Sequence, residues 1–256
     1  MKKHNILLIV IIPIIFNSCS SNLYLNKIPT NEIKVDGNID DWSGDLKYIK
    51  DENSAIGVKN DKDNLYICFT TSDRKKIRQI INLGLTVWLK PVNSKTLGVH
   101  YPINSLENNG FDLRSNNPRI FQNDITYKKY MENNRDFLIV NEENFPLYGL
   151  KIGFNSGYWI SLGFQNGQFI YELAVPFIHT TDHYIPIIEI PENKLGITFE
   201  TGDGDFNLIS NKKFSHDNSR IGDGSDAFGG RRTGNKPFLS SGIDEKIDVS
   251  ITANLQ

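Results

Sequence analysis

Short segments that alternate between apolar and polar residues restrict the possible fold of this chain more than any other feature. In the segment 64–71, alternate positions carry Leu65, Ile67 and Phe69, which leaves Tyr66, Cys68 and Thr70 on the other face. In the segment 83–89, one face would carry Leu83, Leu85, Val87 and Leu89, and the other Thr86 and Trp88. A period of two residues is typical of a β-strand with one buried face. Both segments are therefore predicted to be strands.

Further strands are predicted at 32–35, 137–140, 150–154, 157–164, 168–175, 196–200 and 243–255. Asn155-Ser156-Gly157 and Gln165-Asn166-Gly167 fit hairpin turns between neighbouring strands. Helical signals are few: a charged connector at 73–79 with room for one turn, and a short helix around 127–133. The segments 104–146 and 201–236 are polar or rich in glycine, and we interpret them as long insertions. The pattern predicts an all-β protein, an antiparallel β-sandwich or barrel with long loop insertions.

The N-terminus has the features of a secretion signal. Lys2 and Lys3 precede an apolar run over 6–16 that is too short to span a bilayer, which needs about 20 residues. Phe16-Asn17-Ser18-Cys19 resembles the lipobox of bacterial lipoproteins, which implies that Cys19 is acylated and becomes the new N-terminus. The alternative is an ordinary signal peptide with an incidental cysteine. We predict a signal peptide at 1–18, a tether at 19–31 and a sandwich domain at 32–256, lipid-anchored to the outer membrane on its periplasmic or cell-surface face.

Charge and cysteine content narrow the class of protein further. Removal of Lys2 and Lys3 makes the formal net charge of −2 more negative by two, so there is no basic excess and nucleic acid is not an expected partner. Because the sequence has two cysteines, Cys68 would be left alone after acylation of Cys19. No intramolecular disulfide is then possible, and the packed core must hold the fold.

Three segments carry a family resemblance. Residues 33–42, with Asp36-Gly37 and Trp42, residues 55–67, with Asn64-Leu65-Tyr66, and residues 171–176 resemble the carbohydrate-binding modules of family nine and their DOMON-like relatives. The resemblance implies a jelly-roll sandwich with immunoglobulin-like layers and a non-catalytic module. Sugar-binding members hold a sugar between two aromatic rings, whereas other relatives bind haem.

Aromatic residues are accordingly the candidate ligand-binding residues. An exposed aromatic ring can stack on the apolar face of a sugar, and the candidates for this role are Trp88, Trp159, Tyr158 and Tyr101. Trp88 would lie opposite the aliphatic face of its strand, and one of Tyr158 and Trp159 must point outward because neighbours on a strand alternate. The alternative for each is ordinary packing, and for Trp42 packing against the sandwich is the expected role.

The polar residues give weaker support for catalysis or for the binding of a cofactor or metal. The sequence has no Gly-x-Ser-x-Gly, no P-loop, no His-Glu-x-x-His and no Cys/His nucleophile pattern, so we do not expect an enzyme. Glu172 and Asp73 would suit glycoside cleavage only if the fold brought them together. A haem pair of Met131 and His100, and cation sites at 36–41, 179–183 or 201–207, are weaker possibilities, so no cofactor or metal is expected.

The leading prediction is a non-enzymatic lipoprotein that binds a glycan or small sugar. Two alternative functions stay open. One is a structural or assembly subunit that binds another envelope protein through 104–146 or 201–236. The other is an accessory protein of glycan degradation.

Overall fold

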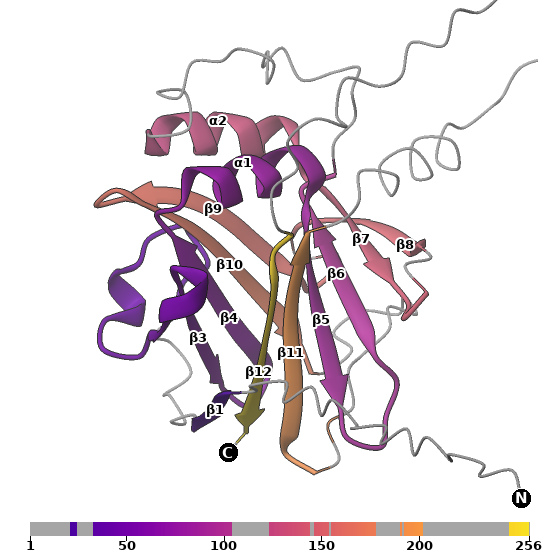
Figure 1. The fold of residues 1–256 in the computed structure, drawn as a ribbon. Helices are drawn as coiled ribbons and strands as arrows, with labels where there is room; N and C mark the ends of the chain where they lie inside the picture. Colours follow the sequence, from indigo (N-terminus) through magenta and orange to yellow (C-terminus); the bar gives the residue numbers. More distant parts are fainter. Residues whose placement is uncertain are drawn as a thin grey trace, which may run out of the picture.

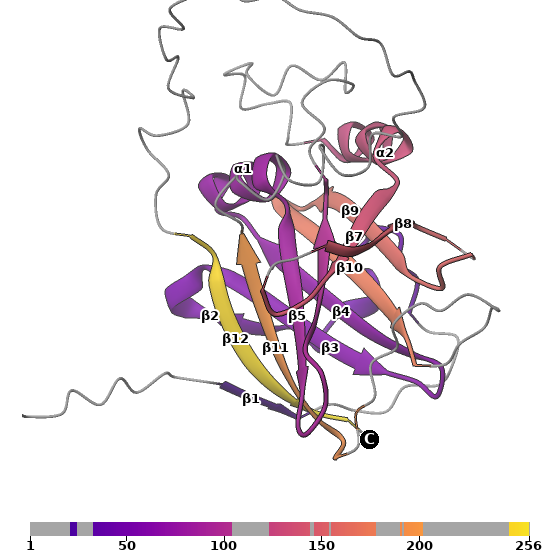
Figure 2. The same cartoon turned by 90° about the vertical axis from the view of Figure 1, so that its right-hand side faces the viewer.

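Two β-sheets face each other across one hydrophobic core (Figures 1 and 2). The computed structural model describes residues 33–103, 123–143, 146–153, 155–177, 190, 192–201 and 246–255, and the backbone of Ser21–Tyr24. The seven-stranded sheet has the order β1 (Ser21–Tyr24), β12 (Asp248–Asn254), β11 (Lys194–Thr201), β5 (Leu85–Pro91), β6 (Leu97–Tyr101), β7 (Asp136–Val140) and β8 (Pro146–Lys151). The five-stranded sheet has the order β2 (Lys47–Ile49), β3 (Ser54–Asn60), β4 (Asn64–Thr71), β10 (Gln168–Pro176) and β9 (Trp159–Gln165). The predicted all-β sandwich is confirmed, with β1 and β12 as a parallel pair among antiparallel ones.

Aromatic contacts between the sheets show which strands face each other. The ring centroids of Phe69 and Phe199 are 5.2 Å apart, which places β4 opposite β11. The rings of Tyr101 and Tyr171 place β6 opposite β10 at 6.5 Å. Phe137 on β7 lies 5.3 Å from Tyr158, immediately before β9. The edge formed by β1 and β12 therefore lies on the opposite side of the sandwich from β8 and β9.

Two helices cover one end of the sandwich (Figures 1 and 2). The longer-than-expected α1 (Arg74–Leu83) begins where the Asp73 carboxylate accepts the backbone N–H groups of Lys75 and Lys76, and it ends at Gly84, whose φ is 78°. Its buried face consists of Ile77, Ile80, Ile81 and Leu83. The strand predicted to start at Leu83 in fact starts at Leu85, because the isoleucine spacing of three and four residues favours a helix up to that point.

The second helix, α2 (Asp124–Asn133), closes one edge of the five-stranded sheet. It buries Tyr127 and Tyr130 and packs along β9. The backbone N–H of Leu162 donates to the Met131 sulfur at 2.9 Å, so a donor at the strand edge has a partner. No helix among the residues described here is long and apolar enough to cross a membrane.

Two further predicted local structures need correction. Residues 33–35 form no strand, because this segment lies over the sheet and donates the Lys34 N–H to the Asp41 carboxylate. The segment 155–157 forms no hairpin, since it connects β8 in one sheet to β9 in the other. By contrast, the turn at Asn166-Gly167 joins β9 to β10 as predicted, and both residues have the positive φ that a two-residue hairpin turn requires.

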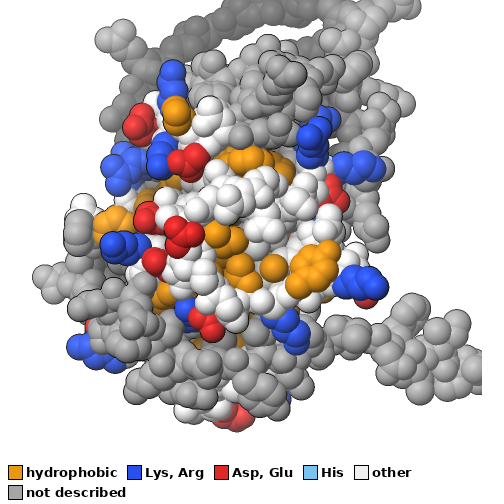
Figure 3. Space-filling view, turned by 90° about the vertical axis from the view of Figure 1, so that its left-hand side faces the viewer, with side chains coloured by type: hydrophobic (Ala, Val, Ile, Leu, Met, Phe, Trp, Pro, Cys, Tyr) orange, Lys and Arg blue, Asp and Glu red, His pale blue; other side chains and the backbone are white. Residues whose placement is uncertain are grey.

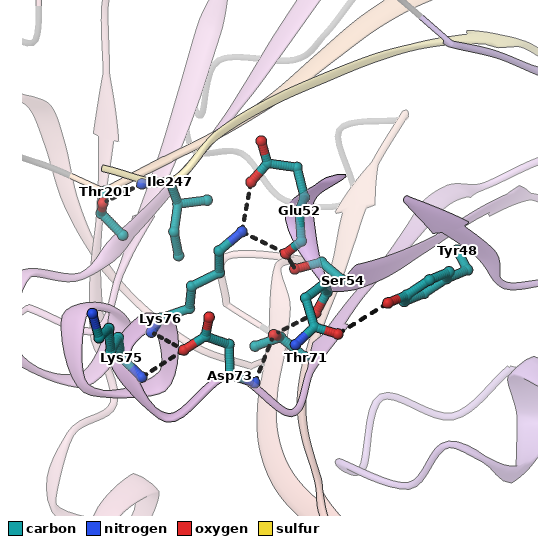
Figure 4. Close-up of polar contacts among 10 residues, drawn as sticks. Tyr48, Glu52, Ser54, Thr71, Asp73, Lys75, Lys76, Thr201 and Ile247 are labelled. Atoms are coloured by element: carbon teal, nitrogen blue, oxygen red, sulfur yellow. Dashed lines mark hydrogen bonds and ion pairs between the residues drawn. The ribbon is translucent and has the colours of Figure 1, made fainter. Parts of the chain in front are cut away.

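A polar network attaches α1 to the short helix η2 (Lys50–Glu52) (Figure 4). The Lys76 ammonium donates to the backbone carbonyl and the carboxylate of Glu52, both at 2.5 Å. The Thr71 hydroxyl donates to the Asn53 carbonyl at 2.9 Å and accepts the Asp73 N–H at 3.1 Å. These contacts hold the start of α1 against the 50–53 turn.

Candidate functional site

The outer face of the five-stranded sheet carries the most distinctive arrangement of side chains. Because alternate residues of β10 fill the core, Ile170, Glu172 and Ala174 point outward. The strand register places residues of four strands in a single row across this face: Trp159, Ala174, Tyr66 and Lys59. The next row contains Ser161, Glu172, Cys68 and Gly57.

The segment 33–46 covers the second row and leaves one end of the first row open. Trp42, in the short helix η1 (Asp40–Trp42), is buried and packs with Cys68 and Ile170. Gly57 lies beneath its ring, and a Cβ there would come within 2.5 Å of Trp42 Cε3. A Cβ at Gly163 would overlap the carbonyl oxygen of Gly37, so the covering segment and β9 are in backbone contact.

Glu172 is the buried carboxylate that holds this segment in place. Its Oε1 accepts the Trp42 Nε1–H at 2.7 Å, and its Oε2 accepts the backbone N–H groups of Asp36 and Gly37 at 2.9 and 2.6 Å. Burial raises the pKa of Glu172 to about 7, and the three donors only partly offset that rise. The carboxyl has a structural role here, because all of these donors belong to the covering segment.

Lys59 lies between Trp42 and the open row. Its ammonium is 2.7 Å from the Asp45 carboxylate, donates to the Asp41 carbonyl at 3.0 Å and lies 5.4 Å from the centroid of the Trp42 ring. These contacts direct its charge toward the covering segment. The open part of the row therefore consists of Tyr66, Ala174 and Trp159.

The open part of the row consists of two aromatic side chains on either side of a small one. Trp159 is 36% exposed, Tyr66 is partly buried, and Ala174 is the buried residue between them. Figure 3 shows the molecule from this side, with apolar side chains exposed in the middle of the face and acidic side chains next to them. An aromatic pair with a small residue between them is a suitable surface for a flat, partly apolar ligand.

Polar groups surround the Tyr66 end of the row. The Tyr66 hydroxyl donates to Asp61 Oδ2 at 2.9 Å and accepts from Asn64 Nδ2 at 3.4 Å. Asp61 Oδ1 accepts the backbone N–H groups of Asp63 and Asn64, both at 2.7 Å, so the loop holds Asp61 in a fixed position. Burial, and then the adjacent Asp61 carboxylate, raise the pKa of Tyr66 to about 12, so its hydroxyl stays protonated at neutral pH.

The four aromatic residues predicted to bind ligand differ in their exposure to solvent. Trp159 points outward and is accessible. Tyr101 and Tyr158 are fully buried in the core, so their prediction as stacking residues is wrong for this structure: each lies on the inward face of the alternation.

Trp88 points away from the core, as expected, but is only 4% exposed. Its ring lies over Gly98, where a Cβ would come within 2.7 Å of the ring, and Leu138 and Val140 pack beside it. Its Nε1–H donates to the Glu200 carboxylate at 2.8 Å. Trp88 therefore has a packing role, and it lies on the other sheet from Trp159.

The other candidate clusters are not assembled by the fold. Asp73 caps α1 whereas Glu172 binds the covering segment, so the two have separate partners. Met131 contacts β9, whereas His100 lies on β6 with its Nδ1 2.9 Å from the Thr86 hydroxyl.

The acidic residues at 36–41 accept local hydrogen bonds from Asn38, Lys34 and Gln165. Among the residues described here, no cluster of three metal-binding side chains is present. Cys19, the motif at 179–183, the segment 202–207 and Gly222-Asp223-Gly224 lie outside the described residues.

Tyr66 is the site residue that the sequence interpretation left out. The alternation over 64–71 already placed it on the outward face. Its relation to Trp159 depends on the pairing of β4 and β9 with β10, and the sequence of any one strand does not contain that information.

A scan of the sequence against known protein families gave no match, and neither did a comparison with curated proteins. Among solved structures, the chain is similar to a family 9 carbohydrate-binding module from Caldicellulosiruptor kristjanssonii in complex with cellotriose, with 12% identity, a TM-score of 0.32, and coverage of 71% of this chain and 76% of that one. The same module in complex with glucose gives 12% identity, a TM-score of 0.29, and coverage of 70% and 78%.

Proposed function

We propose that this protein is a non-enzymatic, lipid-anchored envelope protein that binds carbohydrate at the row formed by Trp159, Ala174 and Tyr66. The observation that carries the proposal is the register that sets the two aromatic residues two strands apart on one outward face. Neighbouring strands are about 4.8 Å apart, so the two backbones are separated by about 10 Å, which leaves room for a sugar ring beside either aromatic ring. Ala174 forms the floor.

The polar surroundings of Tyr66 fit the hydroxyl groups of such a ligand. The Asn64 amide offers a donor and an acceptor at this end, and the buried Asp61 carboxylate holds the Tyr66 hydroxyl and the loop backbone in fixed positions. Sugars combine apolar ring faces with a belt of hydroxyl groups, so an aromatic surface beside an amide suits both features. Glu172 and Lys59 already have partners in the covering segment and take no part.

Calorimetry against cello-, xylo- and other plant, algal and bacterial oligosaccharides tests the proposal. For a ligand that binds, Trp159→Ala and Tyr66→Ala should each weaken affinity by about 30-fold, the effect of removing a central aromatic contact worth about 2 kcal/mol. The matched control is Tyr48→Ala, which removes an aromatic residue that is 60% exposed on β2, at the other edge of the same sheet. No binding by any glycan, or equal binding by all variants, would refute the proposal.

The anchor part of the proposal rests on the lipobox-like Cys19 and the apolar run before it. Cells grown with labelled palmitate should label the wild-type protein and not a Cys19→Ala variant. Fractionation of the outer membrane, with and without protease added to intact cells, then locates the protein. A labelled Cys19→Ala variant would contradict acylation at this residue.

Binding to another envelope protein is a second candidate, favoured by strand β8. Leu147 and Tyr148 on this edge strand are 44% and 41% exposed, and within the described residues no strand pairs with its outer edge. An open edge with exposed apolar residues is a site for strand addition. A photo-crosslinking residue at position 148 should then capture one partner in cells, whereas the same residue at position 132 on α2 should not. Equal labelling at both positions would exclude this interface.

A further inference from the structure

The segment that immediately follows Cys19 is part of the folded domain. Ser21–Tyr24 forms β1, which pairs in parallel with β12 from Ser21 beside Ile251 to Tyr24 beside Asn254. The start of the segment predicted as a tether is thus bound to the edge of the seven-stranded sheet (Figure 1). This pairing sets how far the domain can move from an acyl group on Cys19.

The length of free chain between anchor and sheet is very short. Cys19 precedes Ser21 by two residues, and a polypeptide spans at most about 3.5 Å per residue, so about 7 Å separates them at most. A free tether from Cys19 to position 31 would instead reach about 42 Å. The pairing of β1 with β12 therefore shortens the reach of the domain about sixfold.

The anchored edge and the Trp159 end of the proposed ligand site lie at opposite edges of the sandwich. β1 and β8 are at the two edges of a seven-stranded sheet, about 29 Å apart at about 4.8 Å per strand. Trp159 starts β9, next to Tyr158, whose ring contacts β7 close to the β8 edge. Asp248 and Ser250, just before the part of β12 that pairs with β1, are exposed polar residues on the outer face of this edge.

We infer that the edge formed by β1 and β12 lies directly on a lipid surface, so that the domain is held against the bilayer with the Trp159 end of its aromatic row at the edge far from the membrane. This inference rests on the proposed acylation of Cys19. It predicts a fixed orientation, in which Trp159 lies at the strand edge farthest from the membrane. A domain on a long tether would have no preferred face.

Fluorescence quenching on vesicles tests this orientation. The full-length lipidated protein is reconstituted into phosphatidylcholine vesicles that contain a lipid with a nitroxide on its headgroup. A single fluorophore is attached through Ser250→Cys on β12, or through Tyr148→Cys on β8 as the matched distant site. Cys68 is fully buried and burial raises the pKa of its thiol, so the dye reacts at the introduced cysteine. Quenching should be at least threefold stronger at position 250 than at position 148.

A variant with twelve Gly/Ser residues inserted after Ser20 provides the internal control. It lengthens the free chain to about 50 Å without changing β1, and should make quenching at the two positions similar. Equal quenching in the protein without the insertion would overturn the inference while leaving the anchor intact. A protein that does not float with the vesicles would overturn the anchor itself, and the inference with it.

Discussion

Replacing Glu172 with glutamine should remove a large pH dependence of stability. The carboxyl is buried beneath the segment 33–46, and its pKa rises from 4.5 to about 7 in the folded protein. Between these two values the folded protein holds a proton that the unfolded chain releases. Its contribution to the free energy of unfolding therefore falls as pH rises from 4.5 to about 7, and stays constant above that.

The pKa difference gives the size of the effect. The difference between a pKa of 4.5 and one of about 7, at about 1.4 kcal/mol for each pH unit, corresponds to a loss of about 3 kcal/mol between pH 4.5 and pH 7. Glutamine resembles the neutral carboxyl and does not titrate. Its NH₂ group would face one of the three N–H donors. This cost is the same at every pH, so it does not alter the slope of the stability difference between the two proteins.

Urea unfolding of both proteins at half-unit steps from pH 4.5 to pH 8 measures this dependence. The stability of the wild type relative to Glu172→Gln should fall by about 3 kcal/mol across this range, and the pH at which the curve levels off reports the folded pKa. Glu132→Gln on the exposed surface of α2 should follow the wild-type curve. Parallel curves for the wild type and Glu172→Gln would refute the assignment of Glu172 as the titrating group.

Two further substitutions test the covering segment, and a third tests the ion pair between α1 and η2. Trp42→Phe removes the indole donor to Glu172; we expect a loss of about 2 kcal/mol in urea unfolding and a folded pKa above about 7, and an unchanged pKa would count against the hydrogen bond. Gly57→Ala places a methyl group 2.5 Å from Trp42 Cε3; the expected cost is about 1–3 kcal/mol with an altered near-UV dichroism spectrum, and an unchanged spectrum would show that the ring moves freely. Lys76→Met keeps the aliphatic stem but removes the ion pair with Glu52, so thermal unfolding should show a loss of at most about 1 kcal/mol; a much larger loss would contradict the partly exposed geometry.

Strand alternation made much of the fold predictable. The segment 64–71 is a strand with the predicted bounds, and the turn at Asn166-Gly167 forms where its residues favour a positive φ. Local chemistry determines both features, so a single sequence contains them. The helix α1 was underestimated because Arg74, Lys75 and Lys76 conceal an apolar spacing that becomes clear only from Ile77 onward.

The candidate site could be predicted only in part. Alternation showed that Trp88 and Tyr66 point away from the core, but exposure also depends on the neighbouring strands. Trp88 is buried because Gly98 provides a flat surface beneath it and β7 supplies two aliphatic neighbours. Tyr66 and Trp159 come together through β10, about a hundred residues from β4 in the chain. Such pairings depend on the whole fold and leave no local pattern.

The partners of the first residues of the domain lie far along the chain. Ser21 pairs with Ile251, and the Trp42 indole donates to a carboxylate 130 residues further along the chain. A chain made from its N-terminus therefore leaves Trp42 without its partner until β10 exists, and β1 without its partner until β12 exists. Contacts this far apart in sequence favour slow folding that is completed only late. Loss of the last eight residues, which include most of β12, should leave β1 without its partner strand and the sandwich without a closed edge.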